Sequence, residues 1–230
     1  MKKLALIIIS VVLACCVTVA ANGTSVYIFS AVPEPTVSST GGEWSVIAAA
    51  RGGFEVPDGY FDKYYENAKA FLRENGGVLS SRKYTEYSRV VLALTSIGRN
   101  PENAEGYNLV LPLTDYDAVI RQGINGAIWA LIALNSENYD AGAAHGKYTE
   151  KILSAQNPDG GWANTTGNSD LDTTAMALTA LAAYRQDNRD AADAITLGLS
   201  YLAGQQLPSG AIGTTAETSA QALVALSTLG

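Results

Sequence analysis

The sequence from residue 175 to residue 184 is Ala175-Met-Ala-Leu-Thr-Ala-Leu-Ala-Ala-Tyr184. Its side chains are small or apolar at almost every position, so a helix formed here would have no polar face. A helix that is apolar all round has to be buried on every side. This stretch therefore predicts a central helix that other elements of the fold surround.

The start of this helix belongs to a pattern that occurs five times in the chain. Each copy has an acidic or amide residue, then any residue, then a small residue, and an Ala- and Leu-rich run follows. The copies lie 39 to 47 residues apart, which is the range of helical-hairpin repeats. We therefore expect about five helical hairpins, each with one buried helix. The copies begin at Glu43, Glu86, Asn125, Asp172 and Glu217.

Amphipathic segments lie between these copies. Apolar residues in 60–72 recur at helical spacing with charged residues on the other face, and residues 191–202 repeat the pattern. Glycine- and proline-containing turns follow the amphipathic segments. No stretch has the alternation typical of a strand. We expect an all-α fold, with an inner layer of buried helices and an outer layer of one-sided helices.

Composition excludes several classes of protein. The chain has 230 residues, of which 47% are hydrophobic, so it can form a sizeable core and is not a disordered chain. The net charge of −7, without a basic cluster, argues against a nucleic-acid partner. The cysteines are Cys15 and Cys16, and the single histidine is His145. We therefore expect no metal site and no cofactor.

The N-terminus has the pattern of an export signal. Lys2 and Lys3 precede an apolar segment, and small residues follow at 19–21. We expect a signal peptide at residues 1–21, an exported domain at residues 22–230, and a location outside the cell or in the cell envelope. Two alternatives are an uncleaved membrane anchor, because the apolar stretch is just long enough to span a bilayer, and lipidation at Cys15.

Two turn sequences carry a resemblance to a known superfamily. Gln156-Asn-Pro-Asp-Gly-Gly-Trp162, followed by Asp172-Thr-Thr-Ala175, resembles the repeat of the squalene-cyclase and prenyltransferase superfamily, and Gln206-Leu-Pro-Ser-Gly-Ala-Ile212 resembles a weaker second copy. Residues 41–139 are similar to the secreted bacterial repeat proteins related to the cobalamin-binding intrinsic factor and transcobalamin group. The resemblance implies an α/α toroid. Complete members have six hairpins, so about five imply an incomplete or open ring.

The same resemblance suggests one catalytic motif, Asp170-Leu-Asp172-Thr173. Class II terpene cyclases use Asp-x-Asp-Asp-Thr-Ala, in which the middle acid protonates an alkene. By resemblance Asp172 would be that acid and Asp170 its neighbour, although Thr173 replaces the last aspartate. The alternative is that Asp172 caps the inner helix by accepting backbone N–H bonds. Capping or first-turn acidity accounts for all five copies, so we favour it.

Other catalytic interpretations have less support. The protein prenyltransferases that share this fold hold zinc with Asp, Cys and His, and the chain after residue 21 has no cysteine. His145 lies in an Ala- and Gly-rich segment, which we interpret as a flexible insertion with a solvent-exposed histidine. We therefore expect a protein that is not an enzyme.

The remaining functional interpretation is binding. If the inner helices start at one rim, their acidic and amide residues form a polar ring, with aromatic residues just inside it. A polar rim over an apolar cavity is the usual form of a small-molecule site. The alternative is structural, with the acids as caps and the aromatic residues as core. The candidate ligand-binding residues are Glu43, Trp44, Glu86, Tyr87, Asn125, Trp129 and Glu217.

These patterns favour an exported, non-catalytic module that binds a ligand or interacts at a cell surface. The ligand would be small and apolar or amphipathic, such as a cobalamin-like or isoprenoid molecule. The alternative function is a divergent or partial terpene-cyclase-like enzyme. An open ring would also expose apolar residues on the last inner helix and favour self-association. Those residues are Ala220, Leu223, Leu226 and Leu229.

Overall fold

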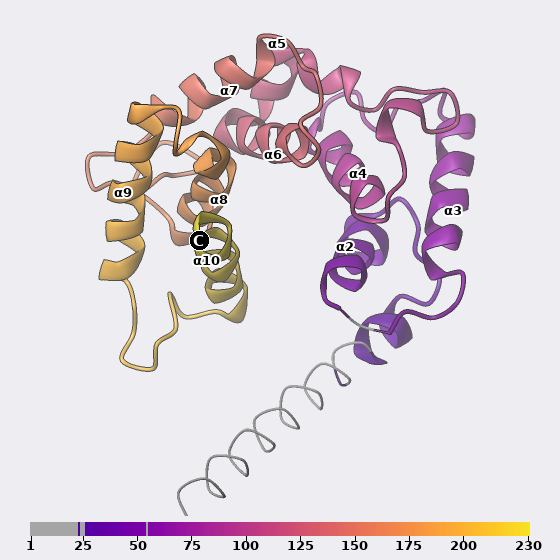
Figure 1. Ribbon diagram of the computed structural model, residues 1–230, viewed down its shortest axis with the longest axis horizontal. Coiled ribbons are helices and arrows are strands. Elements are labelled where there is room, and N and C mark those ends of the chain that lie inside the picture. Colours follow the sequence, from indigo (N-terminus) through magenta and orange to yellow (C-terminus); the bar gives the residue numbers. More distant parts are fainter. Residues whose placement is uncertain (1–22, 24–25, 54) are drawn as a thin grey trace, which may run out of the picture. The chain divides into compact units, whose positions relative to one another are not determined.

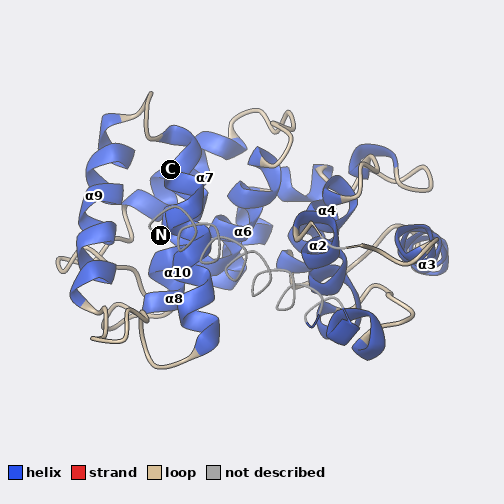
Figure 2. Cartoon of the chain, turned by 60° about the horizontal axis from the view of Figure 1, so that its bottom comes forward, coloured by secondary structure: helices blue, strands red, loops and turns tan. Residues whose placement is uncertain are grey.

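The computed structural model describes residues 23, 26–53 and 55–230. Within these ranges the chain has nine α-helices with described bounds, a short helical segment at residues 26–31 and no strand, which confirms the all-α class (Figure 1, Figure 2). None of the helices found there is both long and apolar enough to cross a membrane. The expected signal peptide, residues 1–21, lies outside the described residues. The helices are α2 (Trp44–Arg51), α3 (Tyr60–Glu74), α4 (Thr85–Ser96), α5 (Tyr116–Val119), α6 (Gly123–Asn135), α7 (Ala144–Leu153), α8 (Leu171–Leu181), α9 (Arg189–Gly204) and α10 (Ala216–Leu229).

The chain forms two compact units. The first contains residues up to Gly77 together with Leu92–Asn100, and the second contains Val78–Val91 and Pro101–Gly230. Helix α4 therefore contributes its first residues to the second unit and its last residues to the first. We describe each unit by itself.

Helix α3 of the first unit has the amphipathic pattern that the sequence predicts. Its buried residues are four apart, because i and i+4 lie on one face of a helix. They are Tyr60, Tyr64, Ala68 and Leu72. Ion pairs hold the polar face of α3: Lys63 Nζ lies 2.5 Å from Glu34 Oε1, and Arg99 Nη2 lies 2.6 Å from Asp62 Oδ1.

Helix α2 follows a single π-helical turn, Ser39–Glu43, in the first unit. The backbone N–H of Thr36 donates a 3.1 Å hydrogen bond to the carbonyl oxygen of Gly41. A Cβ atom on Gly42 would lie 1.6 Å from the carbonyl oxygen of Thr36, so only glycine fits this close approach. Gly42 therefore allows the turn that leads into α2.

The second unit has two layers of helices (Figure 1). Helices α6, α8 and α10 form one layer, in which α8 packs against both of the others. Helices α7 and α9 form the other layer, with α7 against α6 and α9 against α8. Most residues of α8 are buried, as its sequence predicts. The α-helix ends at Leu181 and a 3₁₀ turn, Ala182–Tyr184, follows.

The segment between α4 and α6 departs from the expected alternation of inner and outer helices. It has three 3₁₀ turns (Pro101–Asn103, Leu111–Thr114 and Ile120–Gln122) and the four-residue helix α5. Pro101 and Pro112 remove backbone donors, and positive φ angles at Gly98 and Gly106 reverse the chain. A long helix cannot run through these positions, so this hairpin has no continuous outer helix.

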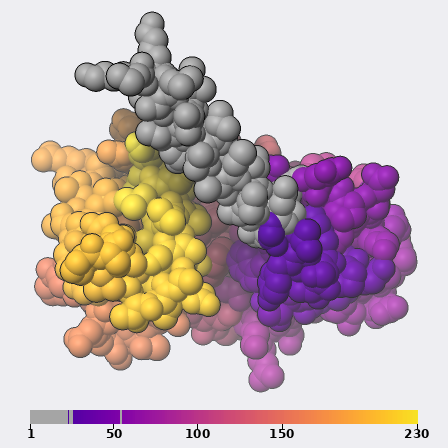
Figure 3. Space-filling view, turned by 90° about the horizontal axis from the view of Figure 1, so that it is seen from below, coloured from indigo at the N-terminus to yellow at the C-terminus, as the bar shows by residue number. Residues whose placement is uncertain are grey.

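Helix α10 leaves an apolar face exposed. Leu223 is 66% exposed, Val224 51% and Leu226 43%, whereas Ala222 and Ala225 are buried on the side that packs. Ala220 is also exposed and Leu229 is partly buried. The expectation of exposed apolar residues on this helix is confirmed for Ala220, Leu223 and Leu226. Figure 3 shows this C-terminal segment, in yellow, at the surface.

Candidate functional site

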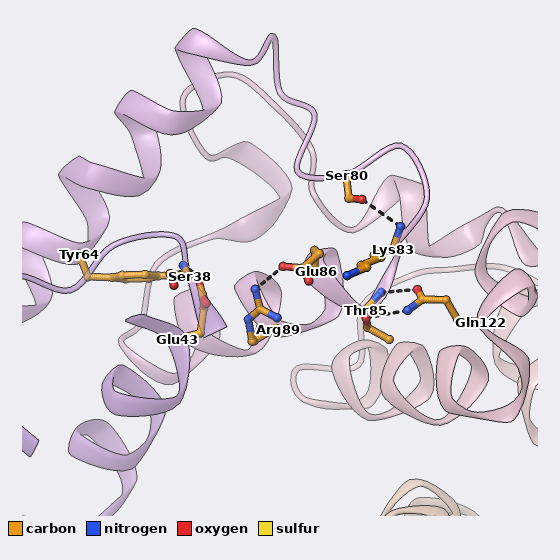
Figure 4. A network of polar contacts seen from close by, with 9 residues as sticks. All are labelled: Ser38, Glu43, Tyr64, Ser80, Lys83, Thr85, Glu86, Arg89 and Gln122. Atoms are coloured by element: carbon orange, nitrogen blue, oxygen red, sulfur yellow. Dashed lines mark hydrogen bonds and ion pairs between the residues drawn. The ribbon is translucent and has the colours of Figure 1, made fainter. Parts of the chain in front are cut away.

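The starts of α4 and α6 are neighbours in the second unit. The backbone N–H of Thr85 donates a 3.0 Å hydrogen bond to Gln122 Oε1, and Gln122 Nε2 donates a 3.0 Å hydrogen bond to Thr85 Oγ1 (Figure 4). Thr85 is the first residue of α4, and Gln122 directly precedes α6. One side-chain amide therefore links two consecutive helix starts.

The starts of α8 and α10 are also close together. A Cβ atom on Gly213, in the loop before α10, would lie 2.9 Å from Leu171 Cδ1 and 2.8 Å from Thr218 Cγ2. Leu171 and Thr218 are in the first turns of α8 and α10. A Cβ atom on Gly123, at the start of α6, would lie 3.8 Å from the carbonyl oxygen of Asn164, in the loop before α8.

The four inner helices α4, α6, α8 and α10 therefore begin side by side in the second unit. Glu86, Asn125, Asp172 and Glu217 are each the second or third residue of one of these helices. Acidic residues in the first turn are favourable there, because a helix N-terminus carries a partial positive charge.

Asp170, and not Asp172, caps α8. Asp170 Oδ1 accepts a 2.7 Å hydrogen bond from the backbone N–H of Thr173, and Asp170 Oδ2 accepts a 3.3 Å bond from the N–H of Asn164. The capping role expected for Asp172 is therefore wrong. The reason is that Asp170 has the extended backbone of an N-cap residue (φ −117°, ψ 153°), whereas Asp172 is already inside the helix.

Neither candidate acid lies in a dry environment. Asp170 and Asp172 are both exposed. A carboxylic acid that protonates an alkene has to stay neutral, and burial in a water-excluded pocket is what keeps it so. The surroundings of these aspartates do not supply that condition.

The other expected rim residues of the second unit differ in exposure. Glu86 is half-buried and forms an ion pair with Arg89 (Figure 4). Tyr87 is only 5% exposed, and its hydroxyl oxygen accepts a 3.2 Å hydrogen bond from the N–H of Leu79. Asn125 and Trp129 are partly buried. Tyr87 is thus mainly a core residue, which supports the structural alternative at this position.

Glu43 and Trp44 belong to the first unit. Glu43 is fully buried, and its Oε1 accepts 3.2 Å hydrogen bonds from the N–H of Ser38 and the hydroxyl of Tyr64. A carboxylate so enclosed is not part of an exposed rim. Trp44 is 41% exposed at the start of α2. Trp44 is therefore accessible to a ligand, as expected, but the neighbouring Glu43 is buried in the core and is not.

The turn at residues 156–162 is held by a set of hydrogen bonds. The N–H of Asn157 donates to the carbonyl oxygen of Gly161 at 2.9 Å, and the N–H of Gly160 donates to that of Asn157 at 2.9 Å. Gln156 Nε2 donates to the carbonyl oxygens of Gly160 at 2.8 Å and Ala194 at 2.9 Å. The glutamine therefore joins the turn to α9.

Trp162 ends this turn as a fully buried side chain. Its indole Nε1 donates a 2.7 Å hydrogen bond to the carbonyl oxygen of Ile152, in the last turn of α7. Its backbone N–H donates a 2.9 Å bond to Thr174 Oγ1, in α8. Trp162 is thus structural and connects α7 with α8.

The second turn sequence has the same hydrogen-bond pattern. The N–H of Leu207 donates to the carbonyl oxygen of Ala211 at 2.8 Å, and that of Gly210 donates to Leu207 at 2.8 Å. Gln206 Nε2 donates to the carbonyl oxygen of Gly210 at 3.0 Å. Each of these bonds has a counterpart between the residues fifty positions earlier, in the turn at 156–162. The similarity of the two sequences is therefore also a similarity of backbone structure.

His145 is not in a flexible loop, contrary to the expectation. It lies in the first turn of α7 and is partly buried. Its Nε2 lies 3.0 Å from the carbonyl oxygen of Tyr139, which can only accept, so Nε2 carries a proton. Its Nδ1 lies 3.1 Å from the hydroxyl oxygen of Tyr184, and that oxygen lies 3.0 Å from Asn135 Oδ1. The histidine thus joins α7 to the end of α6 and the turn after α8.

Two residues at the helix starts were missed by sequence reasoning. Gln122 and Arg89 both make side-chain bonds there, yet neither belongs to the repeated pattern. Gln122 lies 37 residues from its partner, so no local signal indicates the contact. Arg89 had a signal, since it follows Glu86 at the i+3 spacing of helical ion pairs.

No group of three or more metal-ligating side chains occurs within the part of the chain that the structure covers. Comparisons with protein-family models, with curated proteins and with solved structures each found no match. The functional argument therefore depends on the geometry of the chain itself.

Proposed function

We propose that this protein is an exported, non-catalytic helical-repeat module. It binds a small apolar or amphipathic ligand, or a surface partner, at the helix starts of the second unit. One observation carries the non-catalytic assignment: Asp170 is engaged by the N–H of Thr173 at 2.7 Å, and Asp172 is exposed. Both aspartates therefore serve the start of α8, and neither has the burial that a general acid of this kind requires.

The arrangement proposed for the hairpins is an α/α toroid. Three features of the second unit support it: the inner helices begin side by side, α7 and α9 form an outer layer, and the turns at 156–162 and 206–212 share one hydrogen-bond pattern. Repeats that pack in this way turn by a constant angle, which curves the array.

The proposed ligand site lies along the helix starts of the second unit. Asp172 and Glu217 supply exposed carboxylates, Asn125 supplies an amide, and Trp129 supplies a partly exposed aromatic surface. Polar groups beside an aromatic side chain fit a molecule with an apolar body and a polar end. Isoprenoid alcohols and corrinoids have this character.

A product assay tests the non-catalytic assignment. The chain from residue 22 is incubated with squalene or with geranylgeranyl diphosphate, alongside Asp172→Asn. We expect no product from either protein. A cyclised product that the wild type forms and Asp172→Asn does not would overturn the proposal and establish the terpene-cyclase-like alternative.

Calorimetric titration tests the binding assignment, with farnesol and cyanocobalamin as the probes. We expect heat from one of them and weaker binding in Trp129→Leu and Glu217→Gln. Asp193→Asn, on the exposed face of α9, is the matched control and should bind as the wild type does. Binding that is unchanged in Trp129→Leu and Glu217→Gln would contradict the site, and no heat from either probe would contradict the ligand class.

A further inference from the structure

The first unit has a small depression of its own, about 230 Å³ in volume. It lies between the short helical segment 26–31, the turn before α3 and the first turn of α3. Sites for drug-sized molecules are larger, roughly 300–1,000 Å³, so the ligand of this depression would be smaller. Its lining residues are Phe29, Pro33, Pro57, Asp58, Tyr60 and Lys63.

Rings form most of the wall. Phe29 and Tyr60 pack edge to face, with ring centroids 4.9 Å apart and an interplanar angle of 74°. Pro33 and Pro57 add two more rigid apolar groups. Aromatic rings attract cations through their negative faces, and the attraction grows when water is excluded. The wall therefore suits a positively charged group that also has apolar surface.

The charges at the depression do not balance. Lys63 Nζ lies 2.5 Å from Glu34 Oε1, so the lysine charge is compensated by this glutamate. Asp58 is exposed and makes no hydrogen bond or ion pair with any residue that the structure describes. One carboxylate therefore remains uncompensated at a site whose walls are aromatic rings and prolines.

We propose that this depression binds a small organic ammonium ion, with Asp58 as its counter-ion and the ring of Phe29, backed by the buried Tyr60, as its apolar contact. A divalent metal ion fits less well, because Ca²⁺ needs six to eight oxygen ligands and this wall offers one free carboxylate. A neutral ligand would leave Asp58 uncompensated, and an anion would be repelled by it. The site is formed by the first unit alone and does not depend on the function proposed for the helix starts.

A pair of ligands that differ only in charge provides the test. Choline carries a quaternary ammonium group, and 3,3-dimethylbutan-1-ol is its neutral counterpart of the same shape. Calorimetric titration of the full chain should show choline binding at least about tenfold tighter than the neutral alcohol, with an affinity that falls as salt concentration rises. Equal affinities, or no binding of choline, would overturn the proposal.

Variants then assign the binding to this site. Asp58→Asn should weaken choline binding about fivefold or more, and Phe29→Leu about twofold to fivefold, the usual effect of one exposed cation–π contact. Lys63→Gln should strengthen it, because Glu34 then adds a second uncompensated carboxylate. The control is Asp117→Asn, which removes an exposed carboxylate beside a tyrosine in the second unit. Choline affinity unchanged in Asp58→Asn, or reduced as much in Asp117→Asn, would contradict the site.

Discussion

The carboxylate of Asp170 accepts a 2.7 Å hydrogen bond from the backbone N–H of Thr173, and this bond marks where α8 begins. Asp172 is only two residues away, yet its side chain does not take part in the cap. The two aspartates of the motif therefore have different roles, which substitutions can separate.

We expect Asp170→Ala to lower the free energy of unfolding by about 1 kcal/mol, the usual loss for a deleted N-cap. Asp170→Asn should be nearly neutral, because asparagine caps equally well. Asp172→Ala should change stability by less than about 0.5 kcal/mol, as surface substitutions do. Urea denaturation of the three variants and the wild type measures these differences. A larger loss in Asp172→Ala than in Asp170→Ala would show that our assignment of the cap is wrong.

Gly198 should not tolerate a side chain, although it lies in the middle of α9. A Cβ atom there would lie 2.8 Å from Trp162 Cζ3 and 2.9 Å from Leu178 Cδ2. We expect overpacking in Gly198→Ala to lower the free energy of unfolding by about 1–3 kcal/mol. The higher helix propensity of alanine offsets roughly 1 kcal/mol of this loss. Gly146→Ala in α7 is the control, since nothing lies within 4 Å of its Cβ position. That variant should be stabilised by up to about 1 kcal/mol. Thermal unfolding of both variants decides the matter, and a stabilised Gly198→Ala would count against the packing described.

Stability should fall at alkaline pH because of buried tyrosines. Burial raises the pKa of Tyr148 well above its usual value, and the negative charge of Asp115 adds to the effect. Burial also raises the pKa of Tyr184. In the unfolded chain these phenols lose their protons near pH 10, before they do so in the folded chain. Their contribution to stability is therefore present below about pH 10 and lost as the pH rises above it.

Urea midpoints at pH 8 and pH 11 measure this loss. Tyr148→Phe should be less stable than the wild type at pH 8, because the 2.7 Å hydrogen bond from the tyrosine hydroxyl to the carbonyl oxygen of Leu113 is removed. Between pH 8 and pH 11, however, it should lose less stability than the wild type. Tyr27→Phe changes a 72% exposed tyrosine and should follow the wild type. If the wild type and Tyr148→Phe lost the same stability between pH 8 and pH 11, ionisation of Tyr148 would not be the cause of the loss.

The hydroxyl of Tyr60 should be dispensable for folding. It is buried and has no hydrogen-bond partner within the described ranges, and burial raises its pKa. An unsatisfied buried hydroxyl costs free energy, roughly 1–3 kcal/mol. Tyr60→Phe keeps the ring and removes the hydroxyl, so we expect equal or higher stability in thermal unfolding. Tyr64→Phe, which loses the hydrogen bond to Glu43, is the comparison and should be less stable.

Much of the fold could be predicted because its signals are local. The apolar run at 175–184 has no polar face, and it corresponds to the buried helix α8 and the turn after it. Helix α3 could be predicted from its period, since Tyr60, Tyr64, Ala68 and Leu72 mark a single buried face. Within one helix, the spacing of apolar residues shows which face is buried, because residues three and four apart lie on the same face.

The details of the site could not be predicted, because they depend on contacts between distant residues. Asp170 and Asp172 are the same residue type, and only the backbone angles decide which of them caps α8. The neighbours of His145 look flexible in sequence, but Tyr184, 39 residues away, holds its ring. Glu43 occupies the position of an acid at a helix start in the repeated pattern, yet its side chain is buried beside Tyr64.

The close approach of Trp162 to Gly198 has an evolutionary consequence. The indole ring occupies the space where a side chain on α9 would be, so the two positions are constrained to change together. A lineage that keeps the tryptophan has to keep the glycine, and one that shrinks the tryptophan is free to place alanine or serine on the helix. At the corresponding turn before α10 the chain has Ile212, which is smaller. Residues 162 and 198 should therefore covary among sequences related to this chain.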